Sequence, residues 1–173
     1  MWAGVVNDIV IGPFFFDVSL TGERYLSFLE EELVPALATL FPELERPDLP
    51  HHNIWLQQDG APPHFAVEVR TYLNDTFPNR WIGRGGVIEW PPRSPDLTPP
   101  DFFLWGYLKE RVFKSQPANL DDLKHRIRQE IRQITPQMVR NVQQEFVDRL
   151  VDQLRTFTLK KLFLSSPNCF FDK

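Results

Sequence analysis

Residues 52–111 read HNIWLQQDGAPPHFAVEVRTYLNDTFPNRWIGRGGVIEWPPRSPDLTPPDFFLWGYLKER and hold the features that most constrain the fold. An extended apolar run over residues 53–58 stops at Asp59-Gly60, a pair that is typical of tight turns. This pattern predicts a strand with the Asp59 carboxylate at its carboxyl end.

A second acidic side chain follows the next extended run of this stretch. Residues 86–90 predict another strand, and the prolines after it lead to Asp101, in the first turn of an aromatic helix expected over residues 102–113. The ends of neighbouring elements can converge at one edge of an open α/β sheet. We therefore expect Asp59 and Asp101 to form one site.

Two motifs resemble the catalytic core of Tc1/mariner transposases: WLQQDGAPPH at residues 55–64 and WPPRSPDLTPPD at residues 90–101. The resemblance implies an α/β, RNase H-like fold, with a mixed sheet flanked by helices and a helical C-terminal extension. It also implies three carboxylates that hold Mg²⁺ or Mn²⁺ for cutting and joining DNA. Asp59 matches the second of these carboxylates and Asp101 the third.

The chain also departs from that family's pattern. The first catalytic Asp has no match, since Asp8 falls in an expected hairpin turn and Asp17 at the far end of a strand. We therefore expect an N-terminally truncated core that lacks the first strand and has little activity alone, because losing one ligand misplaces the metal ions. The open sheet edge could favour a homodimer. The 41 residues between Asp59 and Asp101 are more than is usual in the family, and no helix-turn-helix precedes the core.

Each site candidate also has an ordinary structural interpretation. Asp59 could simply open an Asp-Gly turn, and Asp101 could be a helix-start carboxylate favoured by the helix dipole. Asp96 is a rival third ligand, which we interpret as a turn former that supports the motif. His64 is expected to hydrogen-bond locally and steady the Asp59 turn rather than act as a base.

Several basic side chains are candidates for DNA contact. The glycine-rich segment of residues 79–86 is expected to be a flexible loop, and its spacing does not match a phosphate-binding P-loop. The candidates lie in this loop and in the helix after Asp101: Arg80, Arg84, Lys109, Arg111 and Lys114. A solvated helix face explains the last three equally well. Four aromatic side chains could stack on bases but are expected to be core: Trp90, Phe102, Phe103 and Trp105.

Composition agrees with a globular chain. Hydrophobic residues make up 42% and aromatic residues 13% of the 173 residues, enough for a sizeable core. The net charge of −4 does not indicate a nucleic-acid binder, but nine acidic side chains and two arginines lie in residues 1–50, so the rest is positive. The single cysteine, Cys169, excludes an internal disulfide, and no apolar run is long enough for a membrane span. With the resemblance, we expect a nuclear protein whose partner is DNA.

Before residue 79 the pattern predicts a hairpin and two helices. Apolar runs over residues 2–6 and 9–16 flank a turn at Asn7-Asp8, and Gly12-Pro13 suggests a bend or a bulge in the second strand. Apolar spacing of three and four predicts helices over residues 22–40 and 65–77. Thr21 would cap the first helix, Pro35 would kink or split it, and residues 41–52 would form a loop.

Beyond residue 117 the chain is expected to be helical. Asn119 or Asp121 caps one helix, and Thr135-Pro136 starts the next. The tail, residues 156–173, could be disordered or an added strand. The predicted division is a core of residues 1–115 and a helical extension of residues 116–173.

Two functions from different classes fit these observations. The first is a transposable-element-derived catalytic-domain fragment, descended from an enzyme of metal-dependent DNA cleavage and strand transfer. The alternative is a non-catalytic domain that binds nucleic acid or protein and keeps the fold without the chemistry. Dependence of activity on metal distinguishes them.

Overall fold

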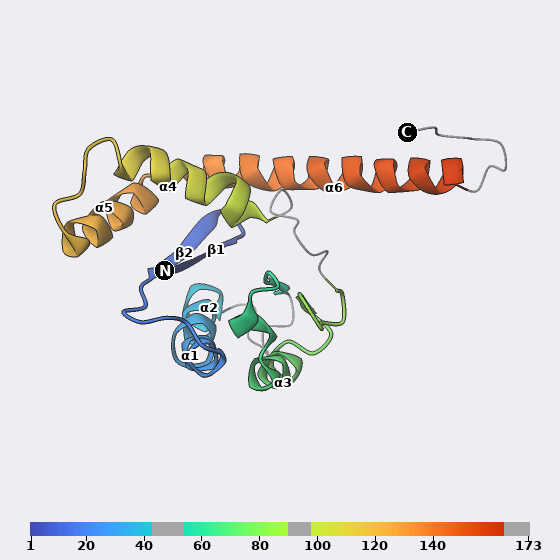
Figure 1. Ribbon diagram of the computed structural model, residues 1–173, viewed down its shortest axis with the longest axis horizontal. Coiled ribbons are helices and arrows are strands. Elements are labelled where there is room, and N and C mark those ends of the chain that lie inside the picture. Colours follow the sequence, from blue (N-terminus) through green and yellow to red (C-terminus); the bar gives the residue numbers. More distant parts are fainter. Residues whose placement is uncertain (43–53, 90–97, 165–173) are drawn as a thin grey trace. The chain divides into compact units, whose positions relative to one another are not determined.

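The computed structural model describes residues 1–42, 54–89 and 98–164, with side chains described up to residue 152 (Figure 1). Trp90, Asp96, most of the expected loop over residues 41–52 and the tail from residue 165 lie outside the described residues. The chain divides into two compact units. Unit 1 comprises Met1–Phe15 and Ser94–Lys173, and unit 2 comprises Phe16–Arg93. The predicted boundary near residue 115 stays a prediction.

Unit 1 begins with the expected hairpin. Strand β1 (Trp2–Val6) pairs antiparallel with β2 (Ile9–Phe14), and Asn7 takes the left-handed backbone conformation that a tight turn needs (φ 48°). Val5 pairs with Val10 and Gly4 with Ile11, but Trp2 pairs with Phe14. The extra residue on β2 is the bulge predicted at Gly12-Pro13, so this prediction is confirmed.

Four helical segments follow the hairpin in the described residues of unit 1. Asp101 lies in the first turn of the π-helical segment η5 (Pro100–Leu104), which continues directly into α4 (Trp105–Val112). Helix α5 (Leu120–Arg132) begins where the Asn119 side chain accepts a hydrogen bond from the Asp122 amide at 2.9 Å. Helix α6 (Pro136–Leu164) begins with Thr135 Oγ1 as acceptor for the Met138 amide, as predicted.

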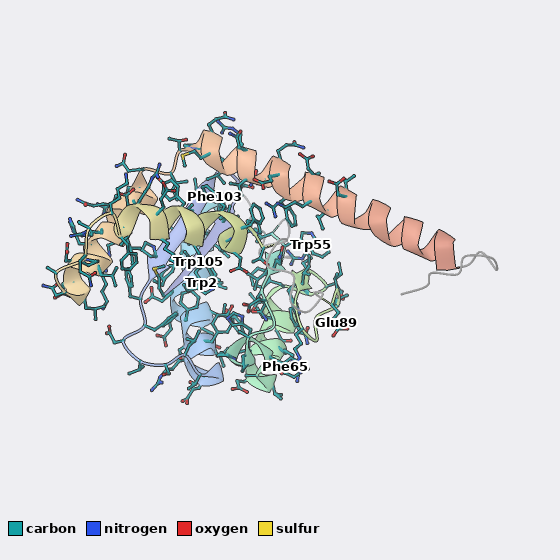
Figure 2. The ribbon with its side chains drawn as sticks, turned by 45° about the horizontal axis from the view of Figure 1, so that its top comes forward. Trp2, Trp55, Phe65, Glu89, Phe103 and Trp105 are labelled. Atoms are coloured by element: carbon teal, nitrogen blue, oxygen red, sulfur yellow. The ribbon has the colours of Figure 1, made fainter. Side chains whose placement is uncertain are left out.

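The core of unit 1 joins the hairpin to the helices. Ala3 of β1, Leu104, Leu108 and Ile131 form a buried cluster, and Phe103 and Trp105 pack against it, partly buried. Figure 1 shows α5 beside α4, and Figure 2 labels Phe103 and Trp105 on the segment that runs by the hairpin. These two aromatic residues are therefore core, as expected.

Unit 2 contains the helix predicted over residues 22–40. Thr21 Oγ1 accepts a hydrogen bond from the Arg24 amide, and α1 (Gly22–Phe28) is followed by the π-helical turn η1 (Leu29–Leu33) and α2 (Val34–Leu40). Pro35 lies at the start of α2. Because proline has no amide hydrogen and its ring crowds the preceding turn, the irregular turn falls directly before it. The chain stays helical from Gly22 to Leu40, so Pro35 does not split the helix, and a kink there stays a prediction.

The other half of unit 2 is a strand–helix–strand unit. Strand β3 (Leu56–Gln57) leads through a 3₁₀ turn, η3 (Pro62–Phe65), and helix α3 (Val67–Thr76) to strand β4 (Trp81–Ile82). The strands are parallel, with Leu56 opposite Trp81, and the Gln58 amide donates to the Ile82 carbonyl at 2.9 Å. This pairing supports the turn that carries Asp59.

Several predicted boundaries in unit 2 are wrong. The expected flexible loop over residues 79–86 contains β4, whose backbone is held by β3. The expected strand over residues 86–90 is reduced, within the described residues, to one bridge between Ile88 and Ile82. The helix expected from residue 65 starts at Val67, because Ala66 is extended (ψ 146°) after the 3₁₀ turn.

Two further boundaries differ from the prediction. Strand β3 covers only part of the run expected over residues 53–58, since its backbone pairing with β4 begins at Leu56. Helix α6 extends to Leu164, well into the expected tail, because residues 156–164 contain neither glycine nor proline to end it. No described helix is both long enough and apolar enough to cross a membrane.

Candidate active site

The Asp59 carboxylate is held by its own turn. Asp59 follows β3 closely, and its Oδ1 accepts a hydrogen bond from the Ala61 amide at 3.0 Å. His64 Nδ1 lies 2.6 Å from the same oxygen. The Asp59 side chain is 53% exposed and that of His64 only 14%. The predicted local contact of His64 is therefore present, and it orients a carboxylate that faces solvent.

These contacts stabilise the ionised form of Asp59. The hydrogen bond from His64 lowers the pKa of Asp59 below its ordinary value of 3.8, partial burial opposes this, and the Ala61 amide lowers it further. Asp59 is therefore charged at neutral pH. Within the described residues its Oδ2 accepts no hydrogen bond and makes no ion pair, so this oxygen is available to a ligand.

A buried polar network fixes the position of His64. The Tyr25 hydroxyl donates to Gln58 Oε1 at 3.1 Å, and Gln58 Nε2 donates to the His64 carbonyl at 3.1 Å. The Tyr25 and His64 rings also contact, with centroids 4.2 Å apart. Tyr25 and Gln58 are both buried. The network therefore connects α1 to the Asp59 turn and limits the movement of the imidazole.

The donor set at Asp59 fits a hard divalent cation. Mg²⁺ and Mn²⁺ prefer carboxylate oxygens, and Asp59 offers an ionised carboxylate whose second oxygen has no partner in the part of the chain that the structure describes. In the described parts of the chain, no three His, Cys, Asp or Glu side chains are grouped as metal ligands. Asp59 could therefore supply one ligand of a metal ion, and the remaining ligands would have to come from other groups.

Asp101 lies in the other unit. It is exposed in the first turn of η5, and its amide donates to the Thr98 carbonyl at 2.8 Å. The neighbouring Leu104 is completely buried, which anchors the segment that presents the carboxylate. Asp59 belongs to unit 2 and Asp101 to unit 1.

The basic candidates differ in their surroundings. Arg80 Nη1 donates to the Ile54 carbonyl at 3.5 Å, which ties down the chain before β3. Arg111 lies over the Tyr107 ring and 3.7 Å from Glu130 Oε2, so it has intramolecular partners. Lys109 and Lys114 are exposed on and after α4, and Arg84 is exposed in the loop after β4. Contact of these side chains with DNA stays a prediction.

Sequence reasoning missed two residues of the network. Gln58 could have been found from strand alternation, because Ile54 and Gln58 are buried whereas Trp55 between them is exposed. A buried glutamine at the end of a strand needs partners. Tyr25 carried no such signal, since its spacing in α1 is that of any core residue.

Replacing His64 by alanine is expected to raise the pKa of Asp59 toward 3.8, because the hydrogen bond that stabilises the anion is lost. Carboxyl ¹³C NMR titration measures this pKa directly. Because the pKa of Asp59 is lower in the folded state than in the unfolded chain, its ionisation stabilises the fold at pH values above the unfolded-state pKa of 3.8. This stabilisation is lost as the pH falls through the lowered folded-state pKa. His125→Ala, the same change at an exposed position of α5, is the control and should leave the pKa of Asp59 unchanged. An unchanged pKa of Asp59 in His64→Ala would contradict the assigned contact.

Comparison with known proteins identifies related chains, although no family model matches. The Tc3 transposase of Caenorhabditis elegans is 30% identical over 103 residues, which is 58% of this chain and 29% of that protein. The catalytic domain of Mos1 transposase, solved with raltegravir and Mg, superposes with a TM-score of 0.64 at 20% identity over 77% of this chain and 61% of that domain. A second structure of this domain, with raltegravir and Mn, gives a TM-score of 0.59 at 19% identity over 75% of this chain and 62% of that domain.

The structural likeness establishes the fold. The mixed α/β arrangement with a helical C-terminal portion is that of the RNase H-like Mos1 catalytic domain, as the motifs implied. The chain spans less than a third of the length of the Tc3 transposase that it matches. Sequence and fold together relate this chain to the catalytic cores of Tc1/mariner-type transposases.

Proposed function

We propose that this chain is a transposase catalytic core that acts on phosphodiester bonds of DNA, with Asp59 and Asp101 as ligands of Mg²⁺ or Mn²⁺. The observation that carries the proposal is the Asp59 turn, in which His64 and the Ala61 amide orient an ionised carboxylate and leave its second oxygen open. The same residues form the motif by which the sequence resembles the family. The relationship to the transposases supports it.

The protein's part in this chemistry is positioning. His64 and the Ala61 amide hold one carboxylate oxygen of Asp59 and direct the other outward, while η5 presents Asp101 from its first turn. A bound divalent cation would supply Lewis acidity toward the attacking and leaving oxygens of the phosphodiester. His64 donates to Asp59 and serves as a positioning residue.

We infer that this 173-residue chain has weak activity by itself. The resemblance implies three carboxylates, and only two positions of this sequence match. Asp8 does not replace the first, since its carboxylate pairs with Arg140 at 3.0 Å in the hairpin turn. Fewer ligands bind the cation less tightly and orient it less well.

The test is nicking of supercoiled plasmid with Mn²⁺. The expected result is slow nicking by the wild-type chain, none in chelator and none by Asp59→Asn. Asp75→Asn, an exposed change of the same charge in α3, is the matched control and should nick as the wild type does. Nicking that persists in Asp59→Asn would contradict the assignment of Asp59.

A second readout does not depend on activity. Mn²⁺ is paramagnetic and should broaden the amide signals of Gly60 and Ala61 in the wild type but not in Asp59→Asn. If neither nicking nor broadening is seen, and DNA binds equally with metal and with chelator, the non-catalytic binding domain is the better description.

Location and assembly follow from the proposed activity. A protein that acts on chromosomal DNA would work in the nucleus, and DNA is then its partner. A homodimer stays a prediction, which the molar mass in solution would test.

A further inference from the structure

Two arginine side chains share one aromatic ring beside the Asp59 turn. The guanidinium carbon of Arg84 lies 4.1 Å from the centroid of the Phe65 ring, and that of Arg70 lies 4.5 Å from it. Figure 2 labels Phe65, which ends the 3₁₀ turn before α3. All three residues belong to unit 2. We call them the Phe65 cluster.

The charges of the Phe65 cluster are not balanced. Within the described residues, the guanidinium groups of Arg70 and Arg84 form no ion pair and no hydrogen bond. Nε of Arg70 is buried and lacks a hydrogen-bond partner in this part of the chain. Two like charges held on one ring repel each other, and a buried donor without an acceptor is unfavourable. An anion bound by the two guanidinium groups would reduce the repulsion between them.

The backbone is shaped around the cluster. Gly85 has a φ of +75°, and a Cβ there would lie 3.1 Å from Phe65 Cε2 and 3.2 Å from Arg70 Cδ. Only glycine combines this conformation with so close an approach. The loop after β4 therefore packs directly on the ring and keeps Arg84 over it.

The cluster lies next to the candidate active site. A Cβ on Gly60, the residue after Asp59, would be 3.8 Å from the Arg84 side chain. Phe65 follows His64 in the same 3₁₀ turn, and His64 contacts Asp59. A ligand held by the guanidinium groups would therefore be close to the carboxylate.

We propose that the Phe65 cluster is a phosphate-binding site, which holds a backbone phosphodiester of a DNA strand and thereby positions that strand at Asp59. Guanidinium groups present paired donors that match phosphate oxygens, and stacking on the ring reduces their freedom. Both guanidinium groups already lie over the Phe65 ring, so the ring is less accessible to a nucleic-acid base. The cluster therefore suits phosphate binding better than base stacking. The choice of DNA as the ligand of this site rests on the proposed function. The site adds Phe65 and Arg70 to the residues that are proposed to contact DNA.

The test is the salt dependence of DNA binding, measured in chelator by fluorescence anisotropy of a labelled oligonucleotide. Arg84→Gln is expected to weaken binding about tenfold and to lower the slope of log affinity against log salt by about one phosphate contact. Arg70→Gln should do the same. Arg24→Gln, an exposed change of equal charge in α1 whose arginine donates to the Ser19 carbonyl, is the control and should leave the slope unchanged.

Each remaining outcome has a definite meaning. Equal losses in Arg84→Gln and Arg24→Gln, an unchanged slope in Arg84→Gln, or no DNA binding by the wild type would each overturn the phosphate site. Arg84 is exposed, so its variant should fold even if Arg70→Gln does not, and circular dichroism checks both. Inorganic phosphate distinguishes a DNA strand from a free anion as the ligand. A shift of the Arg70 Nε–H NMR signal with DNA but not with phosphate supports a site for a DNA strand. Equal shifts at equal concentration indicate a simple anion site and overturn the assignment to DNA.

The result is separable from the proposed function. Binding in chelator does not require the metal, so Asp59→Asn should bind DNA as tightly as the wild type or more tightly, because a negative charge is removed. If the wild-type chain does not nick DNA but Arg84→Gln still lowers the salt dependence of DNA binding, the phosphate site is supported in a non-catalytic protein. Retained nicking with no salt effect would overturn the Phe65 cluster and leave the proposed function in place.

Discussion

Trp81→Ala is expected to destabilise unit 2 by about 3–5 kcal/mol, the range for removing a large buried aromatic side chain. Trp81 is completely buried in β4, opposite Leu56 of β3. Its Nε1 donates to Asn74 Oδ1 at 2.8 Å, which joins the sheet to α3. Alanine would leave a cavity at the centre of the strand–helix–strand unit and remove this hydrogen bond.

The effect should reach both candidate sites of unit 2. A Cβ on Gly86 would lie 2.9 Å from the Trp81 ring, so the loop that carries Arg84 packs on the indole. Strand β3, paired with β4, holds the Asp59 turn. We therefore expect the Gln58 amide, which donates to the Ile82 carbonyl, to lose protection from hydrogen exchange in the variant.

Urea unfolding followed by circular dichroism measures the loss of stability. Trp55→Ala is the matched control. Trp55, which Figure 2 labels, is 53% exposed, so its removal should cost less than about 1 kcal/mol. If the two variants lose equal stability, the parallel pair β3–β4 is not the centre of the unit 2 core.

Leu104→Ala is expected to destabilise unit 1 by about 2–5 kcal/mol. Leu104 is completely buried at the junction of η5 and α4, in the cluster with Ala3, Leu108 and Ile131. Because the segment that carries Asp101 depends on this contact, the variant should also loosen the presentation of that carboxylate.

The measurement again combines unfolding with a local probe. The Trp105 amide, which donates to the Pro100 carbonyl, should exchange faster in Leu104→Ala. Leu120→Ala in α5 is the control, since Leu120 is 61% exposed and its truncation should change the free energy of unfolding by no more than about 0.5 kcal/mol. Comparable losses in both variants would argue against the assigned core of unit 1.

Elements with a strong local signal were predicted well. The hairpin turn at Asn7-Asp8, the cap at Thr21 and the helix start at Thr135-Pro136 depend on residues adjacent in sequence. The same holds for His64, which reaches Asp59 across one short turn. Such contacts form within a few residues of chain, so residue type and spacing are sufficient to predict them.

Elements that depend on distant partners were predicted poorly. Strand β4 is two residues long and followed by a glycine-rich segment, and it exists as a strand because β3 pairs with it. The apolar run after it was predicted as a strand, yet only Ile88 forms a bridge in the described part of that run. Short extended segments have weak intrinsic preferences, so pairing rather than propensity decides their structure.

The two motifs, through the family that they resemble, were enough to predict the fold class, and residue types at short spacing predicted the local contact between His64 and Asp59. The folded chain was needed to show that Tyr25 reaches Gln58 and that Arg70 and Arg84 meet on Phe65. These contacts join residues whose separation along the chain carries no periodic signal. They form because α1, α3 and the loop after β4 pack around one turn, and that packing is a property of the tertiary structure.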